Sequence, residues 1–282
     1  MEFFQIYRPI TGTPFQCDDS YREYEPCEAL KPYVRCFWGS RRPYREEKGE
    51  YGVSTVIPDT CMDIIFDVNF TDNYINSSFC GINDSSFHSD KKVEKSCVVS
   101  TFAVRFYAWS AVFFAEESMS GVKNGFFDAD SHFSSIRKEI APLLFDITSI
   151  NERIPLVETV LMRHLKPERK DRIVTEAVGE ILRHRGNLRM DRLAGEIHVS
   201  NRQIERVFKQ NTGVSPKTLS SLIRYQYVWR EALFQRNFQM QDAVGKFGYT
   251  DQSHLIREFK KFHSLSIRKA LENARKDVGF LQ

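Results

Sequence analysis

LAGEIHVSNRQIERVFKQNTGVSPKTL, residues 193–219, is followed by a second stretch of the same pattern, which ends in GYTDQSHLIREFKKF at 248–262. Phe208 corresponds to Phe259, 51 positions later, and the offset drops to 50 before the turns. Duplicated helical units differ in this way, by a length change that is confined to a turn. The sequence therefore predicts an internal repeat.

Each copy of the repeat is predicted to hold a short helix, a turn and a second helix. The short helices cover 191–197 and 241–247, the turns 198–200 and 248–251, and the second helices 201–211 and 252–262. Ser200 and Gln203 form a capping box, and Gly248 permits the left-handed residue that the second turn needs. This arrangement is a helix-turn-helix unit.

The second helix of each unit combines an apolar side with an outward side that is mostly basic or polar. The predicted outward residues are Arg202, Glu205, Arg206 and Lys209 in the first unit and Gln252, Ser253, Arg257, Lys260 and Lys261 in the second. Arginine suits guanine, glutamine suits adenine and lysine suits phosphate, so this set can read a major groove. One copy alone could equally be a solvated helix face, and the duplication is what favours DNA.

A long helix is predicted between the two units, because Ser215 and Pro216 provide a start signal and apolar residues recur to about Gln235. About twenty residues at ~1.5 Å each give a rod of ~30 Å. One turn of B-DNA is ~34 Å. One subunit is thus expected to reach two successive major grooves of double-stranded DNA, with Lys217, Lys209, Lys260 and Lys261 on phosphates.

These motifs resemble the AraC/XylS family of bacterial transcription regulators over residues 173–274. The resemblance implies two helix-turn-helix subdomains joined by a long helix, and it suggests an activator with RNA polymerase as a candidate partner. The family's base-reading positions fall on Arg202, Arg206, Gln252, Ser253 and Arg257. His198 stands where the first turn usually has glycine, and Ser264 and Ile267 replace a glycine and a proline after the second unit.

The residues before the repeat differ from the C-terminal part of the chain in the sign of their net charge and in the spacing of their apolar residues. Of the net charge of +3, the residues up to 169 contribute −6 and the rest contribute +9. Short runs at 53–57, 61–68 and 98–107 are apolar or alternating and are separated by turn-forming stretches, which predicts strands. We therefore expect an α+β protein with two domains, a β-rich, barrel-like domain at 1–133 and an all-α DNA-binding domain at 173–282.

Between the two expected domains, apolar residues recur at helical spacing over 134–165, and the hydrophilic stretch KPERKDR at 166–172 predicts a linker. The helical segment is expected to couple the domains and to form a homodimer. PYVRCFWG (32–39), VIPDTCMDIIF (56–66) and TFAVRFYAWSAVFF (101–114) resemble an N-terminal domain of some AraC/XylS members. That resemblance implies a sensor or dimerisation domain.

A small-molecule effector pocket in the first domain would need apolar walls and a few polar groups. The candidate effector-binding residues are Trp38, Asp63, Phe66, Phe106 and Trp109. Each aromatic residue could equally belong to the core. The pocket is therefore a hypothesis that stands beside a packed interior.

Several other classes of protein are disfavoured. The sequence has no phosphate loop, dinucleotide fingerprint or nucleophile elbow, so we expect no catalytic site and no cofactor. His88 and His132 lack metal-ligand spacing, and no metal site is expected. The longest uncharged apolar run, 106–115, is about half of what a membrane span needs, and the start of the chain lacks a signal-peptide pattern, so we expect a cytoplasmic protein without membrane contact.

Two alternative functions remain open. The six cysteines, all within the first hundred residues, are Cys17, Cys27, Cys36, Cys61, Cys80 and Cys97. One of them could accept an alkyl group or sense oxidants, although their dispersed spacing does not suggest a zinc site. The other alternative is an architectural protein that binds DNA with little sequence preference.

Overall fold

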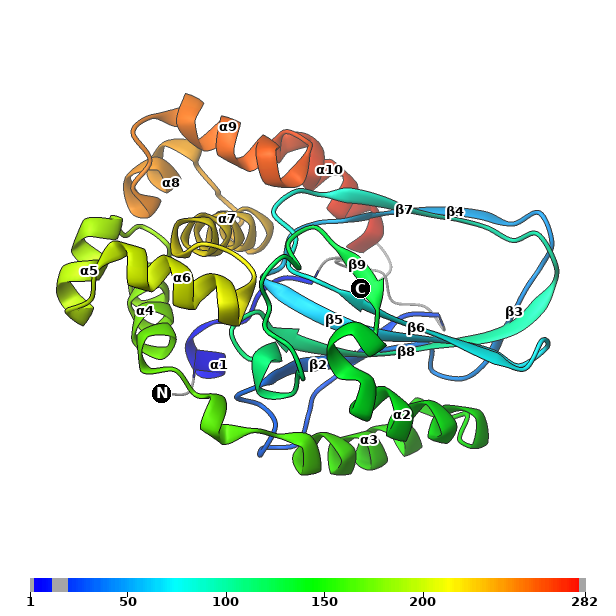
Figure 1. Ribbon diagram of the computed structural model, residues 1–282. Coiled ribbons are helices and arrows are strands. Elements are labelled where there is room, and N and C mark those ends of the chain that lie inside the picture. Colours follow the sequence, from blue (N-terminus) through cyan, green and yellow to red (C-terminus); the bar gives the residue numbers. More distant parts are fainter. Residues whose placement is uncertain (1–2, 12–19, 279–282) are drawn as a thin grey trace.

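The computed structural model describes residues 3–11 and 20–278, in a sheet-rich part and a helical part that lie side by side (Figure 1). The helices that precede the repeat are the short α1 (Phe3–Ile6), then α2 (Asp130–Asp146) and α3 (Ile150–His164). Then follow α4 (Arg172–Arg183), α5 (Met190–Ile197), α6 (Asn201–Thr212), α7 (Pro216–Phe234), α8 (Met240–Phe247), α9 (Gln252–His263) and α10 (Ile267–Val278). This confirms the expected α+β fold.

The N-terminal domain is built on an antiparallel sheet of seven strands. Its strands are β1 (Arg22–Tyr24), β2 (Val34–Gly39), β3 (Tyr44–Glu46), β5 (Cys61–Asn69), β6 (Tyr74–Cys80), β8 (Cys97–Tyr107) and β9 (Phe126–Asp128). The order is β1-β2-β8-β5-β6-β9, with β3 on β8, while β4 (Tyr51–Val56) and β7 (Phe87–Lys92) form a separate ribbon. The pairing path does not return to its first strand, so the domain is barrel-like but open.

One face of this sheet forms the core under α2. Phe102, Val104 and Phe106 alternate along β8 and are fully buried, as the period of two in the sequence predicts. Phe133 of α2 stacks on Phe106 with ring centroids 6.0 Å apart. α3 is fixed by Arg153, whose buried guanidinium donates hydrogen bonds to the carbonyl groups of α2 and the following loop and to a serine hydroxyl of β8.

The expected linker is attached to the N-terminal domain. Residues 166–172 contain the 3-10 turn Pro167–Arg169 and the first residue of α4. The Lys166 ammonium donates to the carbonyl oxygen of Ala115 at 2.8 Å, and the Arg169 guanidinium donates to that of Glu116 at 3.0 Å. Hydrophilic composition predicted an exposed connection, but its long basic side chains bind backbone carbonyl groups. Domain boundaries at 133 and 173 stay a prediction.

A buried glutamine of α7 joins the two parts of the molecule. Gln226 is 2% exposed, and its amide donates to the carbonyl oxygen of Pro58 at 2.6 Å. Its side-chain oxygen accepts from the backbone N–H of Ile10 at 2.8 Å. The N-terminal segment thus lies between the long helix and the sheet domain. Within the described residues, no helix has the length and apolar character that a membrane span requires.

Candidate nucleic-acid interface

The first helix-turn-helix unit consists of α5, a short turn and α6. His198 ends α5 in the left-handed conformation, with φ of 54°, and so takes the role of the glycine that is usual there. The Ser200 hydroxyl caps α6 by accepting from the backbone N–H of Gln203 at 3.3 Å. Ile204 and Phe208 are buried beneath the helix. The outward side chains Arg202, Glu205, Arg206 and Lys209 are all exposed.

The second unit repeats this construction with α8 and α9. Gly248 supplies the left-handed turn with φ of 67°, and Asp251 caps α9 by accepting from the backbone N–H of His254 at 2.8 Å. Leu255 and Phe259 are buried. The outward side chains Gln252, Ser253, Arg257, Lys260 and Lys261 are exposed. The two predicted reading faces therefore occupy equivalent positions in the two units.

Correspondence between the units extends past their second helices. Gly213 ends α6 with φ of 74°, and Ser264, 51 positions later, ends α9 with φ of 61°. Ser215 then caps α7, and Ser266 accepts from the first turn of α10 at 3.3 Å. Although Ser264 and Ile267 replace the usual glycine and proline, serine residues thus provide both the left-handed position and the cap before α10.

α7 separates the two reading helices. It spans nineteen residues, which is about 28 Å at 1.5 Å per residue. Lys217 is exposed on its first turn. The length is thus close to the expected ~30 Å rod, and it is near one turn of B-DNA.

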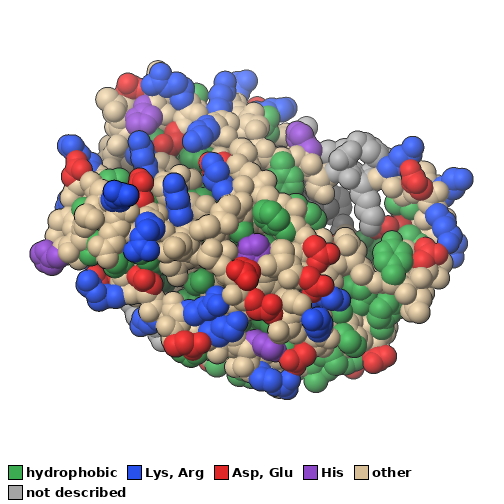
Figure 2. Space-filling view, in the orientation of Figure 1, with side chains coloured by type: hydrophobic (Ala, Val, Ile, Leu, Met, Phe, Trp, Pro, Cys, Tyr) green, Lys and Arg blue, Asp and Glu red, His purple; other side chains and the backbone are tan. Residues whose placement is uncertain are grey.

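The reading arginines are available for a ligand. Among the described residues, Arg202, Arg206 and Arg257 have no ion-pair partner, whereas Arg192 on the supporting helix α5 is paired with Glu196 at 2.7 Å. Figure 2 shows lysine and arginine side chains gathered over the helical end of the molecule. Unpaired guanidinium groups on an exposed helix can form bidentate contacts with guanine.

Comparison with known protein families gives two matches. A helix-turn-helix domain family matches residues 193–273, the part of the chain that contains both units, and a domain of unknown function (DUF6597) matches residues 22–128. The chain carries an AraC-type DNA-binding domain. It is a DNA-binding transcription regulator with a sheet-rich N-terminal domain.

Solved structures that are similar to this chain include a transcriptional regulator from Chromobacterium violaceum, described as an AraC-type DNA-binding domain-containing protein. It is 22% identical, with 36% of this chain and 91% of that chain covered, and a TM-score of 0.33. ToxT from Vibrio cholerae is 12% identical over 82% of this chain and 96% of its own, with a TM-score of 0.39. These scores are low, and the family match over 193–273 carries the assignment. No curated protein matches the chain.

The regulator's five candidate effector residues lie in three separate places. Phe66 and Phe106 are fully buried on the core face of the sheet. Asp63 lies on the opposite face, because successive side chains of a strand alternate, and it accepts from the Trp38 indole N–H at 3.0 Å. Trp109 follows β8 and stacks on Tyr107 with centroids 5.1 Å apart. The five therefore do not line one cavity.

Arg105 is the residue of this N-terminal group that sequence reasoning missed. It is 5% exposed, and its Nε donates to Asp63 Oδ1 at 2.8 Å. Its guanidinium lies 5.5 Å from the centre of the Trp38 ring. Its place on β8 opposite Asp63 follows from strand register, and no local pattern in the sequence gives that register.

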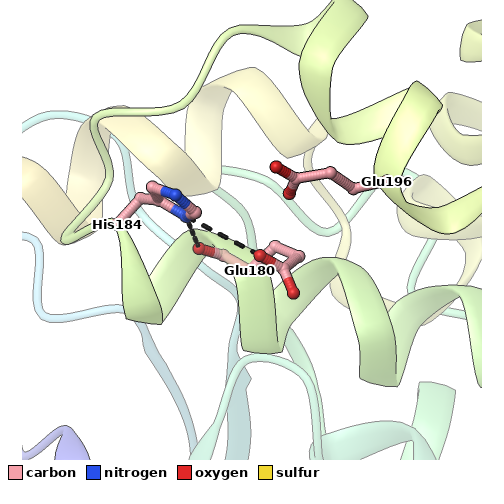
Figure 3. Close-up of side chains that lie close together, drawn as sticks. All are labelled: Glu180, His184 and Glu196. Atoms are coloured by element: carbon pink, nitrogen blue, oxygen red, sulfur yellow. Dashed lines mark hydrogen bonds and ion pairs between the residues drawn. The ribbon is translucent and has the colours of Figure 1, made fainter.

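Glu180, His184 and Glu196 are a group of possible metal ligands that the sequence analysis did not consider (Figure 3). Their ligand atoms lie within 4.8 Å of one another, and the spacing of four between Glu180 and His184 on α4 was a readable signal. The donor types suit a divalent cation. However, Arg183 pairs with Glu180, and Arg192 pairs with Glu196. Each carboxylate thus already has an arginine partner on its own helix, α4 for Glu180 and α5 for Glu196, which argues against a bound cation.

The cysteines of the regulator have little thiolate character where they are buried. Burial raises the pKa of Cys80 to about 12 and raises the pKa of Cys36 and Cys61 well above the usual range. Burial also raises the pKa of Cys27. Since the thiolate is the nucleophile, these four are poor alkyl acceptors. Cys17 lies outside the described residues.

Proposed function

We propose that this regulator binds a bipartite DNA site by placing α6 and α9 in two successive major grooves on one face of the duplex. The observation that carries the proposal is the equivalence of two exposed basic faces, one on α6 and one on α9, in two units that α7 connects. Arg202, Arg206, Gln252, Ser253 and Arg257 select bases, and Lys209, Lys217, Lys260 and Lys261 bind phosphates. Glu205 lies on the same face and can accept from cytosine.

Substitution of one arginine in each unit tests base reading. Arg206→Ala and Arg257→Ala should each weaken binding to the cognate site by ~1–3 kcal/mol and relax the preference at one base pair. Affinity for random duplex DNA should change much less. Fluorescence anisotropy at one stated salt concentration gives both values, with Arg268→Ala on α10, 92% exposed at its side chain, as the matched control. Equal losses on cognate and random DNA would indicate an architectural binder.

We propose that the effector binds in a groove between α1, α4, α7 and α8, where the N-terminal segment meets the helical domain. Its volume is about 660 Å³, within the usual range for small-molecule sites. Tyr227 and Phe247 line it, and Phe234 is 67% exposed at its edge. Arg185 and Arg230 also line it and have no carboxylate partner among the described residues. These features favour an aromatic or aliphatic anion as the effector.

A matched pair of small molecules tests this groove. 4-Phenylbutyrate should raise the melting temperature of the full chain more than 4-phenylbutanol, because only the former carries a carboxylate for the arginines. Arg185→Gln should abolish that difference, and Arg189→Gln, an exposed residue outside the groove lining, should keep it. An equal shift with both compounds would show that no anion site exists there.

Homodimerisation through the helices between the domains is the third part of the proposal. On α3, Leu156 and Met162 are 40% and 46% exposed, so two apolar side chains of the outward half of the helix are available to a second copy. Sedimentation at micromolar concentration should show a dimer, and Leu156→Glu should shift it to a monomer. A wild-type protein that is monomeric with and without DNA would exclude dimerisation.

Activation of transcription by contact with RNA polymerase, in the cytoplasm, completes the proposed role.

A further inference from the structure

One turn of α7 is the place where both helix-turn-helix units attach. Gly186, just after α4, has φ of 76°, and a Cβ there would lie 2.2 Å from the carbonyl oxygen of Ser220 and 2.6 Å from the backbone nitrogen of Arg224. The Ser220 hydroxyl donates to the Gly186 carbonyl oxygen at 2.9 Å. The segment that leads into the first unit therefore rests on the backbone of α7 over residues 220–224.

The side chain of Arg224 reaches the second unit from the same turn. Its guanidinium binds both carboxylate oxygens of Glu258 on α9, with Nε 2.9 Å from Oε1. The Tyr249 hydroxyl donates to the same Oε1 at 2.8 Å, and the guanidinium lies 4.4 Å from the centre of the Tyr249 ring. The side chains of Arg224 and Glu258 are only 13% and 12% exposed. A fork of two hydrogen bonds fixes the orientation of α9 as well as its distance from α7.

The two units also meet directly next to this ion pair. Gly248, in the turn of the second unit, lies so close to the loop after α4 that a Cβ would come within 2.0–2.4 Å of three atoms of the Asn187 side chain. Asn187 directly follows Gly186. The first unit's leading loop thus contacts α7 on one side and the second unit's turn on the other.

We infer that Gly186, Asn187, Arg224, Tyr249 and Glu258 form an inter-unit joint that sets the angle and spacing of the two reading helices, with Arg224 as its positioning residue. The inference rests on the proposed two-groove binding. None of these residues belongs to a reading face, so the joint acts on DNA recognition only through the placement of α9. Its consequence is that the protein prefers one spacing between the two half-sites.

The joint can be loosened without leaving a buried charge unpaired. In Arg224→Met combined with Glu258→Gln, both charges are removed together, and the glutamine oxygen can still accept from Tyr249. Replacing both members of a buried pair is often tolerated, whereas removing one is not. Arg224→Lys is the second variant, because it keeps the charge and loses the fork. Arg268→Met, from an exposed pair on α10, is the control.

The experiment measures spacing preference with the full-length protein. A duplex that the wild-type protein selects from random-sequence DNA provides the site, and Arg206→Ala and Arg257→Ala identify its two halves. Up to five base pairs are then inserted between the halves, which turns one half-site by about half a helical turn. Wild-type affinity should fall by about tenfold or more. With the double variant, binding to the original site weakens, the loss on insertion falls to about threefold or less, and the first half-site alone binds as before.

The outcomes separate this inference from the proposed function. If insertions leave wild-type affinity unchanged, two-groove binding itself is wrong. If the insertions weaken wild-type binding and weaken the binding of both joint variants by the same factor, the joint has only a structural role and the inference is overturned. If the double variant melts several degrees below the wild type, Arg224→Lys provides the test instead. If the fork of two hydrogen bonds positions α9, its spacing preference should lie between those of the wild type and the double variant.

Discussion

The two helix-turn-helix units share one sequence pattern, yet their surroundings differ. The end of α6 in the first unit contacts the N-terminal domain, where the backbone N–H of Met119 donates to the Gln210 carbonyl oxygen at 2.8 Å. A Cβ on Gly213 would lie 2.7 Å from a methyl carbon of Val122. At the equivalent end of α9, a hydroxyl contact joins Ser264 to Ser86 of the β6–β7 loop. The first unit is therefore closely packed on the N-terminal domain.

The N-terminal domain thus contacts the two units differently. It contacts the end of α6 through the loop that contains Met119 and Val122, with a backbone hydrogen bond, and it contacts the end of α9 through one pair of serine hydroxyl groups. The duplication accounts for the matching exposed faces of α6 and α9, whereas the contacts of each copy with the rest of the chain differ.

Gly186→Ala is the substitution with the largest expected effect, because it acts where both units meet. The new methyl group would collide with backbone atoms of α7 that cannot move aside, and alanine is strained at a φ of 76°. The free energy of unfolding should drop by about 3 kcal/mol or more. Denaturant titration followed by circular dichroism measures this loss.

Gly121→Ala is the matched control for that prediction. Gly121 has a similarly positive φ of 88°, but nothing lies within 4 Å of the position that its new methyl group would take. Its cost should be backbone strain alone, roughly 1–2 kcal/mol. Equal losses for the two substitutions would mean that contact of Gly186 with α7 contributes nothing, and the units would then be independent.

Acid should weaken the second unit before the first. His263 is 6% exposed, its Nδ1 shares a hydrogen bond with the Tyr225 hydroxyl, and burial lowers its pKa to about 4 from an ordinary 6.5. The unfolded chain therefore binds a proton between pH 6.5 and about 4 that the folded chain does not. Stability is complete above pH 6.5 and falls as the pH decreases, by up to about 3 kcal/mol near pH 4.

Thr212 occupies the same position as His263 in the first unit, 51 residues earlier, and it does not titrate. His263→Thr places the same non-titrating residue in the second unit. The stability of this variant should therefore change little between pH 4 and 6.5, as measured by thermal melts. His184→Thr on α4, a half-buried histidine, serves as the control. A variant profile as steep as the wild-type one would place the acid sensitivity elsewhere.

Local sequence was enough to predict which side chains of α6 and α9 are exposed, but not which contacts hold these helices in place. The offset of 51 and the helical period placed Arg206 and Arg257 correctly outward, because both depend on neighbouring residues. The Arg224–Glu258 pair spans 34 positions and forms only when α7 packs against α9, so no local sequence pattern predicts it. For Asp63 and Phe66, by contrast, the sequence already contained the answer. They lie three positions apart on one strand, and alternation of side chains places them on opposite faces of the sheet.

The helix caps give the smallest expected difference between the units. Asp251 accepts from its helix at 2.8 Å and carries a charge that favours the positive end of α9, whereas the neutral Ser200 accepts at 3.3 Å. Asp251→Ala should cost about 1–2 kcal/mol and Ser200→Ala about 0.5–1 kcal/mol of unfolding free energy. Thermal melts of each variant give these values.

Salt separates the two contributions to the Asp251 cap. Asp251→Asn keeps the acceptor and removes the charge, so its cost should shrink as the ionic strength rises, while the cost of Ser200→Ala should not. A larger cost for Ser200→Ala would reverse the comparison. It would mean that packing of α6 on the N-terminal domain makes the first unit more sensitive to its helix start. The second unit would then be the one whose contacts with α7 compensate for a lost cap.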